Sequence, residues 1–263
     1  MYYFVIGAIF KNESHILNEW IKHYLFHGID HIYLINDHST DNFLEILEPF
    51  IKANKVTLYN CDETKVYKGM QWDKYQKHFM KHMKETFWFG IFDLDEFLYS
   101  PRIIDVKEIL KNYEKSPLLH IDWVHFGSSG FIEQPENVVD NFLYRGEYNS
   151  IKNGPKGSFN NRKSIFKASD DVIIGIHTSS FRNSKNEKLR NGIGKNISYN
   201  YDKNNPPLLI NHYAIQSLEF WKNIKIPRGS ANNFRVRDMQ LFYDCDVNDI
   251  KDERLKQQNS TII

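Results

Sequence analysis

The stretch YYFVIGAIFKNESHILNEWIKHYLFHGIDHIYLIN, residues 2–36, predicts a buried strand, a helix and a second buried strand. Residues 2–10 form a nearly continuous apolar run, which is typical of a strand covered on both faces. Apolar residues then recur at helical spacing, and Gly28 follows where a left-handed residue ends many helices. Residues 31–36, HIYLIN, are again apolar. This order predicts two parallel strands joined by a right-handed crossover.

The same alternation continues after residue 36. We expect a helix over residues 43–51 capped by Asp41, a strand over 55–60, a helix over 71–86 and a strand over 87–92. The predicted fold class is therefore α/β, with a mostly parallel central sheet flanked by helices in one domain over residues 1–263. In the less regular second half we expect short strands at 118–125, 162–168, 171–178 and 208–213, a long surface loop over 183–207, a helix from Ser217 and a loose polar tail after residue 249.

The composition argues against several kinds of protein. The 263 residues include 34 Lys and Arg against 33 Asp and Glu, and this net charge of +1 argues against a nucleic-acid-binding protein. Apolar residues make up 41%, as in globular proteins, and no apolar run approaches the ~20 residues of a membrane span. The N-terminus has no basic segment of the signal-peptide kind, and the two cysteines form no disulfide framework. We expect a cytoplasmic protein with at most peripheral membrane contact.

The sequence Asp93-Leu94-Asp95-Glu96 directly follows the predicted strand at 87–92. In open α/β sheets, ligands bind outside the carboxyl ends of the strands. Asp93 and Asp95, one residue apart, can reach the same ion, and carboxylates together with phosphate oxygens suit Mg²⁺ or Mn²⁺. The alternative interpretation is a solvated acidic turn in which Asp95 or Glu96 caps a helix. The position of the DxD segment directly after a buried strand favours the first interpretation, a site for a metal-bound diphosphate.

Two further polar segments follow predicted strands at the same edge of the sheet, residues 11–13 and 36–41. Their amide and carboxylate groups could bind a base and a ribose, although Ser39 and Asp41 are equally suited to capping a helix. The chain lacks both the GxGxxG and the GxxxxGK[ST] patterns, which argues against a dinucleotide dehydrogenase and a P-loop enzyme. A phosphatase of the DxD type is disfavoured, because those enzymes carry the DxD after their first strand and this chain does not. A glycoside hydrolase is disfavoured, because its two catalytic carboxylates lie farther apart than Asp93 and Asp95.

Four blocks of the sequence resemble glycosyltransferases with the GT-A fold, of the family 2 and family 92 type. They are FKNESHILNEWIKHYLFHGIDHIYLINDHSTDN at 10–42, WFGIFDLDEFL at 88–98, WVHFGSSG at 123–130, and INHY at 210–213 with SLEF at 217–220 and RG at 228–229. The resemblance implies a Rossmann-like GT-A domain with a nucleotide-binding half over about 1–100 and an acceptor-binding half over about 101–250. It also implies transfer of a sugar from a nucleotide-sugar donor, expected to be a UDP-sugar, with Mn²⁺ or Mg²⁺ as cofactor.

The same resemblance implies roles for individual residues. Asp93 and Asp95 match the DxD motif: Asp95 would bind the metal, and Asp93 would contact the ribose or reach the metal through water. His212 matches a further metal ligand, with His177 as the rival histidine. A second set matches positions that face the nucleotide: Asn12, Glu13, Asp37 and Gln71. The family often has Lys four residues after its histidine, and here that position is Gln216. The missing charge would come from Lys222, Lys225 or Arg228, or donor affinity would be lower.

The acceptor side is less defined by the sequence. The resemblance suggests an inverting reaction, which needs a carboxylate base. Asp122 and Glu133 flank the FGSSG segment, although a surface or structural role is the favoured interpretation of each. We expect a glycan or glycolipid acceptor. The abundance of Lys, Asn and Ile indicates an AT-rich genome, and surface polysaccharide or lipopolysaccharide synthesis is then the expected pathway. The alternative function is a non-catalytic protein, descended from a transferase, that binds a nucleotide sugar or a glycan.

Overall fold

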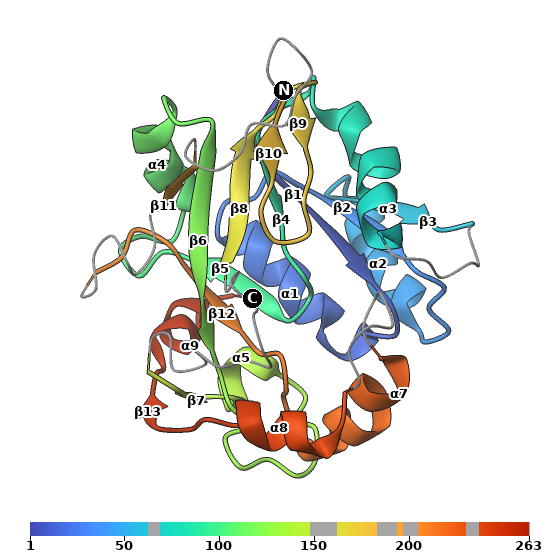
Figure 1. Ribbon diagram of the computed structural model, residues 1–263, viewed down its shortest axis with the longest axis vertical. Coiled ribbons are helices and arrows are strands. Elements are labelled where there is room, and N and C mark those ends of the chain that lie inside the picture. The colour runs from blue at the N-terminus through green and yellow to red at the C-terminus, as the bar shows by residue number, and fades with distance from the viewer. Residues whose placement is uncertain (63–68, 148–161, 183–193, 197–204, 230–236, 263) are drawn as a thin grey trace.

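A nine-stranded sheet lies at the centre of the computed structural model, which describes residues 1–62, 69–147, 162–182, 194–196, 205–229 and 237–262 (Figure 1). Its order is β3-β2-β1-β4-β8-β6-β12-β5, and β11 pairs with β6 beside this path. Strands β1 to β4 run parallel, β8 is antiparallel to both of its neighbours, and β5 is antiparallel to β12. The predicted α/β class and mostly parallel sheet are confirmed.

The strands are β1 Tyr2–Phe10, β2 His31–Asn36, β3 Val56–Asn60, β4 Thr86–Ile91, β5 Glu96–Tyr99, β6 Leu118–His125, β7 Tyr144–Arg145, β8 Arg162–Lys167, β9 Val172–Ile173, β10 Ser180–Phe181, β11 Gly194–Asn196, β12 Leu209–His212 and β13 Ile250–Lys251. The helices are α1 Ser14–Phe26, α2 Phe43–Lys52, α3 Met70–Phe79, α4 Val106–Leu110, α5 Val138–Asn141, α6 Leu218–Phe220, α7 Ile226–Arg228, α8 Met239–Cys245 and α9 Arg254–Asn259. Short 3-10 turns occur at Met80–His82 and Lys111–Tyr113, and a π-helical turn at Trp221–Lys225 joins α6 to α7. In the described part of the chain, every helix is too short or too polar to cross a membrane.

Helix α1 holds the loop that follows β4. The Trp20 side chain is fully buried, and its Nε1 donates to the carbonyl oxygens of Asp93 and Glu96, at 3.0 Å each. The Tyr24 hydroxyl donates to the Glu96 carbonyl at 3.0 Å and accepts from the Leu98 amide at 3.1 Å. Buried hydrogen bonds of this kind are costly to break, so the apolar face of α1 fixes the backbone that carries the DxD carboxylates.

Gly28 ends the turn after α1 as predicted. Its φ is +94°, and a Cβ at this position would lie 2.1 Å from Asp105 Oδ1, so only glycine fits. The predicted cap of α2 is wrong. Asn42 precedes that helix without a side-chain cap, and the Asp41 carboxylate instead accepts from the Ser14 amide of α1 at 2.8 Å.

Several expectations for the second half need correction. The helix predicted over 71–86 ends at Phe79, followed by one 3-10 turn, and the strand predicted at 171–178 is only the two-residue β9. The tail after residue 249 is not loose, because β13 pairs with β7 and α9 follows it. The helix expected from Ser217 is confirmed, and the Ser217 hydroxyl caps it by accepting from the Phe220 amide. Most of the loop expected over 183–207 lies outside the described residues.

Candidate functional site

Strand direction brings the predicted site segments to one edge of the sheet. Strands β4 and β6 are each antiparallel to β8, and β12 is parallel to β6, so β4 and β12 point the same way. His212, the last residue of β12, therefore lies at the edge where Asp93 and Asp95 follow β4. The carboxyl ends of β1 and β2 meet at this edge too, because the Asp37 amide donates to the Phe10 carbonyl at 2.8 Å.

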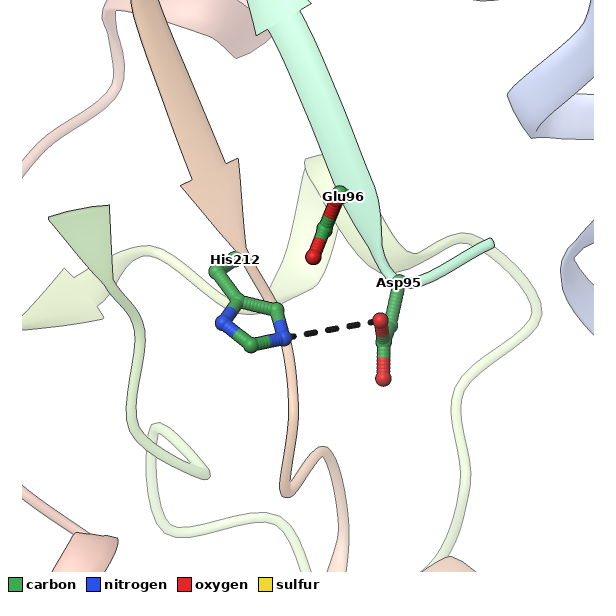
Figure 2. Close-up of side chains that lie close together, drawn as sticks. All are labelled: Asp95, Glu96 and His212. Atoms are coloured by element: carbon green, nitrogen blue, oxygen red, sulfur yellow. Dashed lines mark ion pairs between the residues drawn. The ribbon is translucent and has the colours of Figure 1, made fainter. Parts of the chain in front are cut away.

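Asp95, Glu96 and His212 form a candidate metal site. One ligand atom from each side chain lies within 4.8 Å of the other two, and His212 Nε2 lies 3.5 Å from Asp95 Oδ1. Figure 2 shows the His212 ring and the Asp95 carboxylate facing each other where β12 ends and β5 begins, with Glu96 beside them. Glu96 Oε1 is buried and accepts no hydrogen bond from the described residues. Two side-chain carboxyl groups and an imidazole suit a divalent cation.

The DxD carboxylates differ from the predicted arrangement, in which Asp93 and Asp95 share an ion. Asp93 Oδ2 pairs with Lys163 Nζ at 2.9 Å. The three potential metal ligands are Asp95, Glu96 and His212, so Glu96 stands where Asp93 was expected. Lys163 comes from β8, is fully buried, and also lies 3.5 Å from Glu96 Oε1. Burial opposes ionisation of Asp93, yet the Lys163 ammonium holds the pKa of this carboxyl below its usual range. Burial raises the pKa of Glu96 well above its usual value, although Lys163 opposes that effect.

Asp95 is engaged by a second lysine. Lys225 Nζ lies 2.6 Å from Asp95 Oδ2, and the two residues are only 4% and 7% exposed. Burial would raise the pKa of the Asp95 carboxyl, but the Lys225 ammonium, with His212, holds it well below its usual range. Lys225 is thus placed at the DxD segment, as the prediction of a nearby cation required. It belongs to the π-helical turn after α6, which brings a residue 130 positions away to this carboxylate.

The residues after β1 are held by contacts with other segments of the predicted site. Glu13 Oε1 pairs with Arg228 Nη1 at 2.8 Å, and the same guanidinium donates to the Lys11 carbonyl at 3.1 Å. Asn12, with a left-handed φ of +52°, accepts from the Thr40 amide at 2.8 Å. Arg228 and Glu13 neutralise each other here, so neither is an isolated charge facing a ligand.

The residues after β2 and in α3 form a third cluster. Asp37 Oδ1 pairs with Lys74 Nζ at 2.6 Å, and Lys74 is 3% exposed. Burial alone raises the pKa of a carboxyl, but the hydrogen bond from Lys74 lowers the pKa of Asp37. Gln71, one turn before Lys74, is buried and donates to the Tyr75 hydroxyl at 2.7 Å. Sequence reasoning missed Lys74 and Lys163, although they lie in the helix expected over 71–86 and the strand expected at 162–168.

The two candidate bases lie in positions that do not mark a catalytic carboxylate. Asp122 faces Arg162 across the β6–β8 ladder, with Arg162 Nε 3.1 Å from Asp122 Oδ1, so its structural interpretation is favoured. Glu133 is exposed on the loop before α5, and Lys222 is exposed on the π-helical turn. Neither has a hydrogen bond or ion pair that ties it to the DxD segment in the described structure.

His177, the rival histidine, and Gln216, which stands where the family often has a lysine, lie near the candidate metal site but outside it. The rings of His177 and His212 both contact Trp123, with centroid distances of 5.4 and 4.4 Å. His177 is outside the group of three potential ligands. Gln216 is buried and does not reach the DxD carboxylates; its Oε1 accepts from Gln134 Nε2 at 2.9 Å and lies 3.2 Å from His15 Nε2.

The model of the glycosyltransferase family 92 matches residues 3–255, nearly the whole chain. The chain belongs to glycosyltransferase family 92. The resemblance read from the four sequence blocks is thereby confirmed at the level of the family.

Two plant members of family 92 are similar to part of the chain. A family 92 protein of Ricinus communis is 28% identical over 144 residues, which cover 49% of this chain and 24% of the relative. A family 92 protein of Oryza sativa subsp. japonica is 26% identical over 143 residues, covering 51% of this chain and 23% of the relative. The matched region therefore spans about a quarter of the length of these curated relatives.

Solved structures show more distant similarity. The structure of S. aureus TarS 1–349 is similar with a TM-score of 0.36 at 16% identity, over 63% of this chain and 47% of that fragment. The same fragment in complex with UDP-GlcNAc has a TM-score of 0.37 at 16% identity, with coverages of 52% and 40%. HddC from Yersinia pseudotuberculosis has a TM-score of 0.39 at 14% identity, with coverages of 75% and 90%. TM-scores this low carry no argument about function, so the assignment of the candidate site is based only on the geometry of this chain.

Proposed function

We propose that this protein transfers a sugar from a nucleotide-diphosphate donor, a UDP-sugar, to a hydroxyl group of a glycan acceptor. The observation that carries the proposal is the convergence of Asp95, Glu96 and His212 at the sheet edge where β1 and β2 also end. Membership of family 92 supports the class of reaction. The acceptor is a glycan or glycolipid in surface polysaccharide or lipopolysaccharide synthesis, and the location is cytoplasmic; these parts rest on the sequence interpretation.

Asp95, Glu96 and His212 would hold Mn²⁺ or Mg²⁺. When bound there, the ion would supply charge neutralisation to the diphosphate and Lewis acidity to the leaving group. Asp93 lies two residues from Asp95 and would orient the ribose, with Lys163 fixing its carboxylate. Lys225 would share the diphosphate charge once its ammonium leaves Asp95. Asp37 and Lys74, at the end of β2, would contact the nucleotide together with Asn12 and the buried Gln71.

The test is a calorimetric titration of UDP-, GDP- and CMP-sugars with and without Mn²⁺, followed by an assay of donor hydrolysis and transfer. We expect UDP-sugar binding that EDTA abolishes. Asp95→Asn should lose both metal-dependent binding and turnover, and Glu48→Gln, at an exposed position on α2, should lose neither. Equal donor affinity with and without Mn²⁺ would refute the metal role. Metal-dependent binding without hydrolysis or transfer would instead support the alternative, a non-catalytic nucleotide-sugar-binding protein.

A further inference from the structure

Two fully buried histidines of α1, His23 and His27, contact backbone carbonyls in the segment that follows the DxD residues. His23 Nε2 lies 2.8 Å from the Leu98 carbonyl oxygen of β5, and His27 Nδ1 lies 3.1 Å from the Ile104 carbonyl oxygen before α4. A carbonyl oxygen can only accept a hydrogen bond, so each of these nitrogens carries a hydrogen. These two contacts fix the tautomer of each ring in its neutral form.

The other nitrogen of each ring faces the same side chain, Asn259 at the end of α9. His23 Nδ1 lies 3.1 Å from the amide nitrogen of Asn259, and His27 Nε2 lies 2.9 Å from the amide oxygen. The two rings are one helical turn apart, with their centroids separated by 4.3 Å. The docking of α9 on α1 therefore depends on how one amide meets two imidazoles.

Asn259 can satisfy this pair in two protonation states. With one proton added to His27, its Nε2–H donates to the amide oxygen while the amide nitrogen donates to His23. With both rings neutral, the amide turned over places its NH₂ group where the oxygen lies, 2.9 Å from His27 Nε2 and 3.4 Å from His23 Nδ1, so its two hydrogens serve both lone pairs. A second proton fits neither orientation, because two imidazolium rings would then stand against each other and against one amide.

The charges around the pair favour His27 as the ring that takes the first proton. Burial lowers the pKa of His27 and holds the pKa of His23 well below its usual value, and the Asp105 carboxylate opposes the effect of burial at His27. Burial also raises the pKa of Glu19 to about 7 and that of Glu96 well above its usual value, and both shifts stabilise the folded state in acid. The other charged residues on the surrounding elements are Lys22 on α1, Arg102, Lys107 and Glu108 around α4, Asp140 on α5, and Glu253, Arg254 and Lys256 at α9.

We propose that His23, His27 and Asn259 form a proton-sensitive clasp that holds α9 on α1 at neutral pH and loosens in acid. When α9 is undocked, each ring can take up a proton near the ordinary histidine pKa of about 6.5. The docked pair holds at most one proton, so undocking in acid takes up at least one more. The stability of the docked state is therefore complete above about pH 6.5 and falls as the pH drops below it.

The clasp ends the segment that supports the FGSSG loop. The Gly127 amide donates to the Tyr144 carbonyl of β7 at 2.9 Å, β7 pairs with β13, and α9 follows β13. The buried Arg145 and Asp252 also join these two strands, with Arg145 Nε 2.7 Å from Asp252 Oδ2. A looser α9 thus leaves this support of the loop with one anchor fewer. The carbonyl contacts of His23 and His27 do not change, because their hydrogens are present in both charge states.

Hydrogen exchange of the full chain at pH 7.5 and pH 5, without nucleotide or metal, measures the docking. The readout is the protection of residues 254–262 after correction for the intrinsic exchange rate at each pH. One excluded proton lowers the docking equilibrium constant about thirtyfold between these two pH values. We therefore expect the protection of α9 in the wild type to be about thirtyfold lower at pH 5 than at pH 7.5.

Asn259→Asp should reverse this pH dependence. Its carboxylate accepts from both rings when they are protonated, which raises their pKa in the docked state, so docking is strongest below about pH 6.5 and weakens as the pH rises. We expect at least threefold more protection at pH 5 than at pH 7.5. Gln257→Glu adds the same charge at an exposed position of α9 and should behave as the wild type.

A double variant removes the titrating rings but keeps both carbonyl contacts. In His23→Gln with His27→Asn, the amide nitrogens stand in place of Nε2 and Nδ1, and neither side chain titrates. Circular dichroism at both pH values verifies that each variant is folded. We expect the protection of α9 in this double variant to differ by less than threefold between the two pH values.

Three results overturn the inference. The first is wild-type protection of residues 254–262 that differs by less than threefold between pH 7.5 and pH 5. The second is the same pH dependence in Asn259→Asp as in Gln257→Glu. The third is a thirtyfold acid loosening that persists in the folded double variant. None of these measurements depends on sugar transfer, so they test the clasp independently of the proposed function.

Discussion

Replacing Lys225 by Met should change metal affinity and donor affinity in opposite directions. Lys225 Nζ lies 2.6 Å from Asp95 Oδ2 in a buried setting, so the ammonium and a divalent cation compete for the same carboxylate. At an effective dielectric constant of ~20, two unit charges at this distance attract by about 6 kcal/mol before desolvation is counted. If a quarter of this attraction opposes metal binding, its loss is worth about 1.5 kcal/mol, which is slightly more than a factor of ten in Kd.

Isothermal titration of Mn²⁺ and then of UDP in saturating Mn²⁺ measures both effects. We expect Lys225→Met to bind Mn²⁺ without nucleotide at least tenfold more tightly than the wild type. We also expect it to bind UDP at least tenfold more weakly, because the lysine no longer shares the diphosphate charge. Lys222→Met, at an exposed position three residues earlier, is the matched control and should change neither affinity by more than about twofold. Weaker Mn²⁺ binding to Lys225→Met would show that the lysine supports the metal site and does not compete with the ion.

The same variant has a stability cost that a double variant can separate from binding. Removing one member of a buried ion pair costs about 3–5 kcal/mol, because the remaining charge is left without a partner. We therefore expect Lys225→Met to lower the free energy of unfolding in urea by this amount. Lys225→Met combined with Asp95→Asn should recover most of the loss, because no buried charge remains unpaired. A double variant no more stable than Lys225→Met would contradict the pairing.

Three further predictions concern the ligands themselves. Asp95→Asn should abolish transfer, and near-normal turnover at saturating Mn²⁺ would exclude Asp95 as a ligand. The same variant should lower the unfolding midpoint in urea, because Asp95 is buried against Lys225. The position of Asp95 at a strand end had suggested a partly solvated group. His212→Ala should raise the Mn²⁺ concentration for half-maximal activity by about tenfold or more, whereas His177→Ala should leave it nearly unchanged; the reverse pattern would move the third ligand to His177. Glu96 has a pKa raised by burial, so the folded state holds its proton to higher pH than the unfolded state and wild-type stability falls as the pH rises above about 4.5. Glu96→Gln has no proton to lose, so its unfolding free energy in urea should fall less than that of the wild type between pH 5 and 7.5; parallel pH profiles would contradict the shift.

The first half of the fold was predictable because its signals are local. A buried parallel strand needs an apolar run, and a helix packed on it needs apolar residues at helical spacing. The strands and helices of residues 2–60 are therefore predictable from the local pattern of apolar residues. The DxD segment follows from the same reasoning, since it comes directly after the apolar run of β4. His212 was placed at the same edge because it ends an apolar strand, and its Nε2 lies 3.5 Å from Asp95.

The ion pairs of the site depend on long-range packing that no local sequence pattern specifies. Lys163 reaches Asp93 only because β8 inserts antiparallel between β4 and β6, and no local pattern in the chain specifies that insertion. The π-helical turn after α6 brings Lys225 to Asp95 across 130 positions of sequence. Periodicity reports which side of a strand is buried, but not which strand lies beside it. Local sequence patterns therefore predict the sheet edge and its carboxylates. The lysine that pairs with each of Asp93 and Asp95 is known only from the folded chain, because long-range strand order sets the distances on which ion pairs depend.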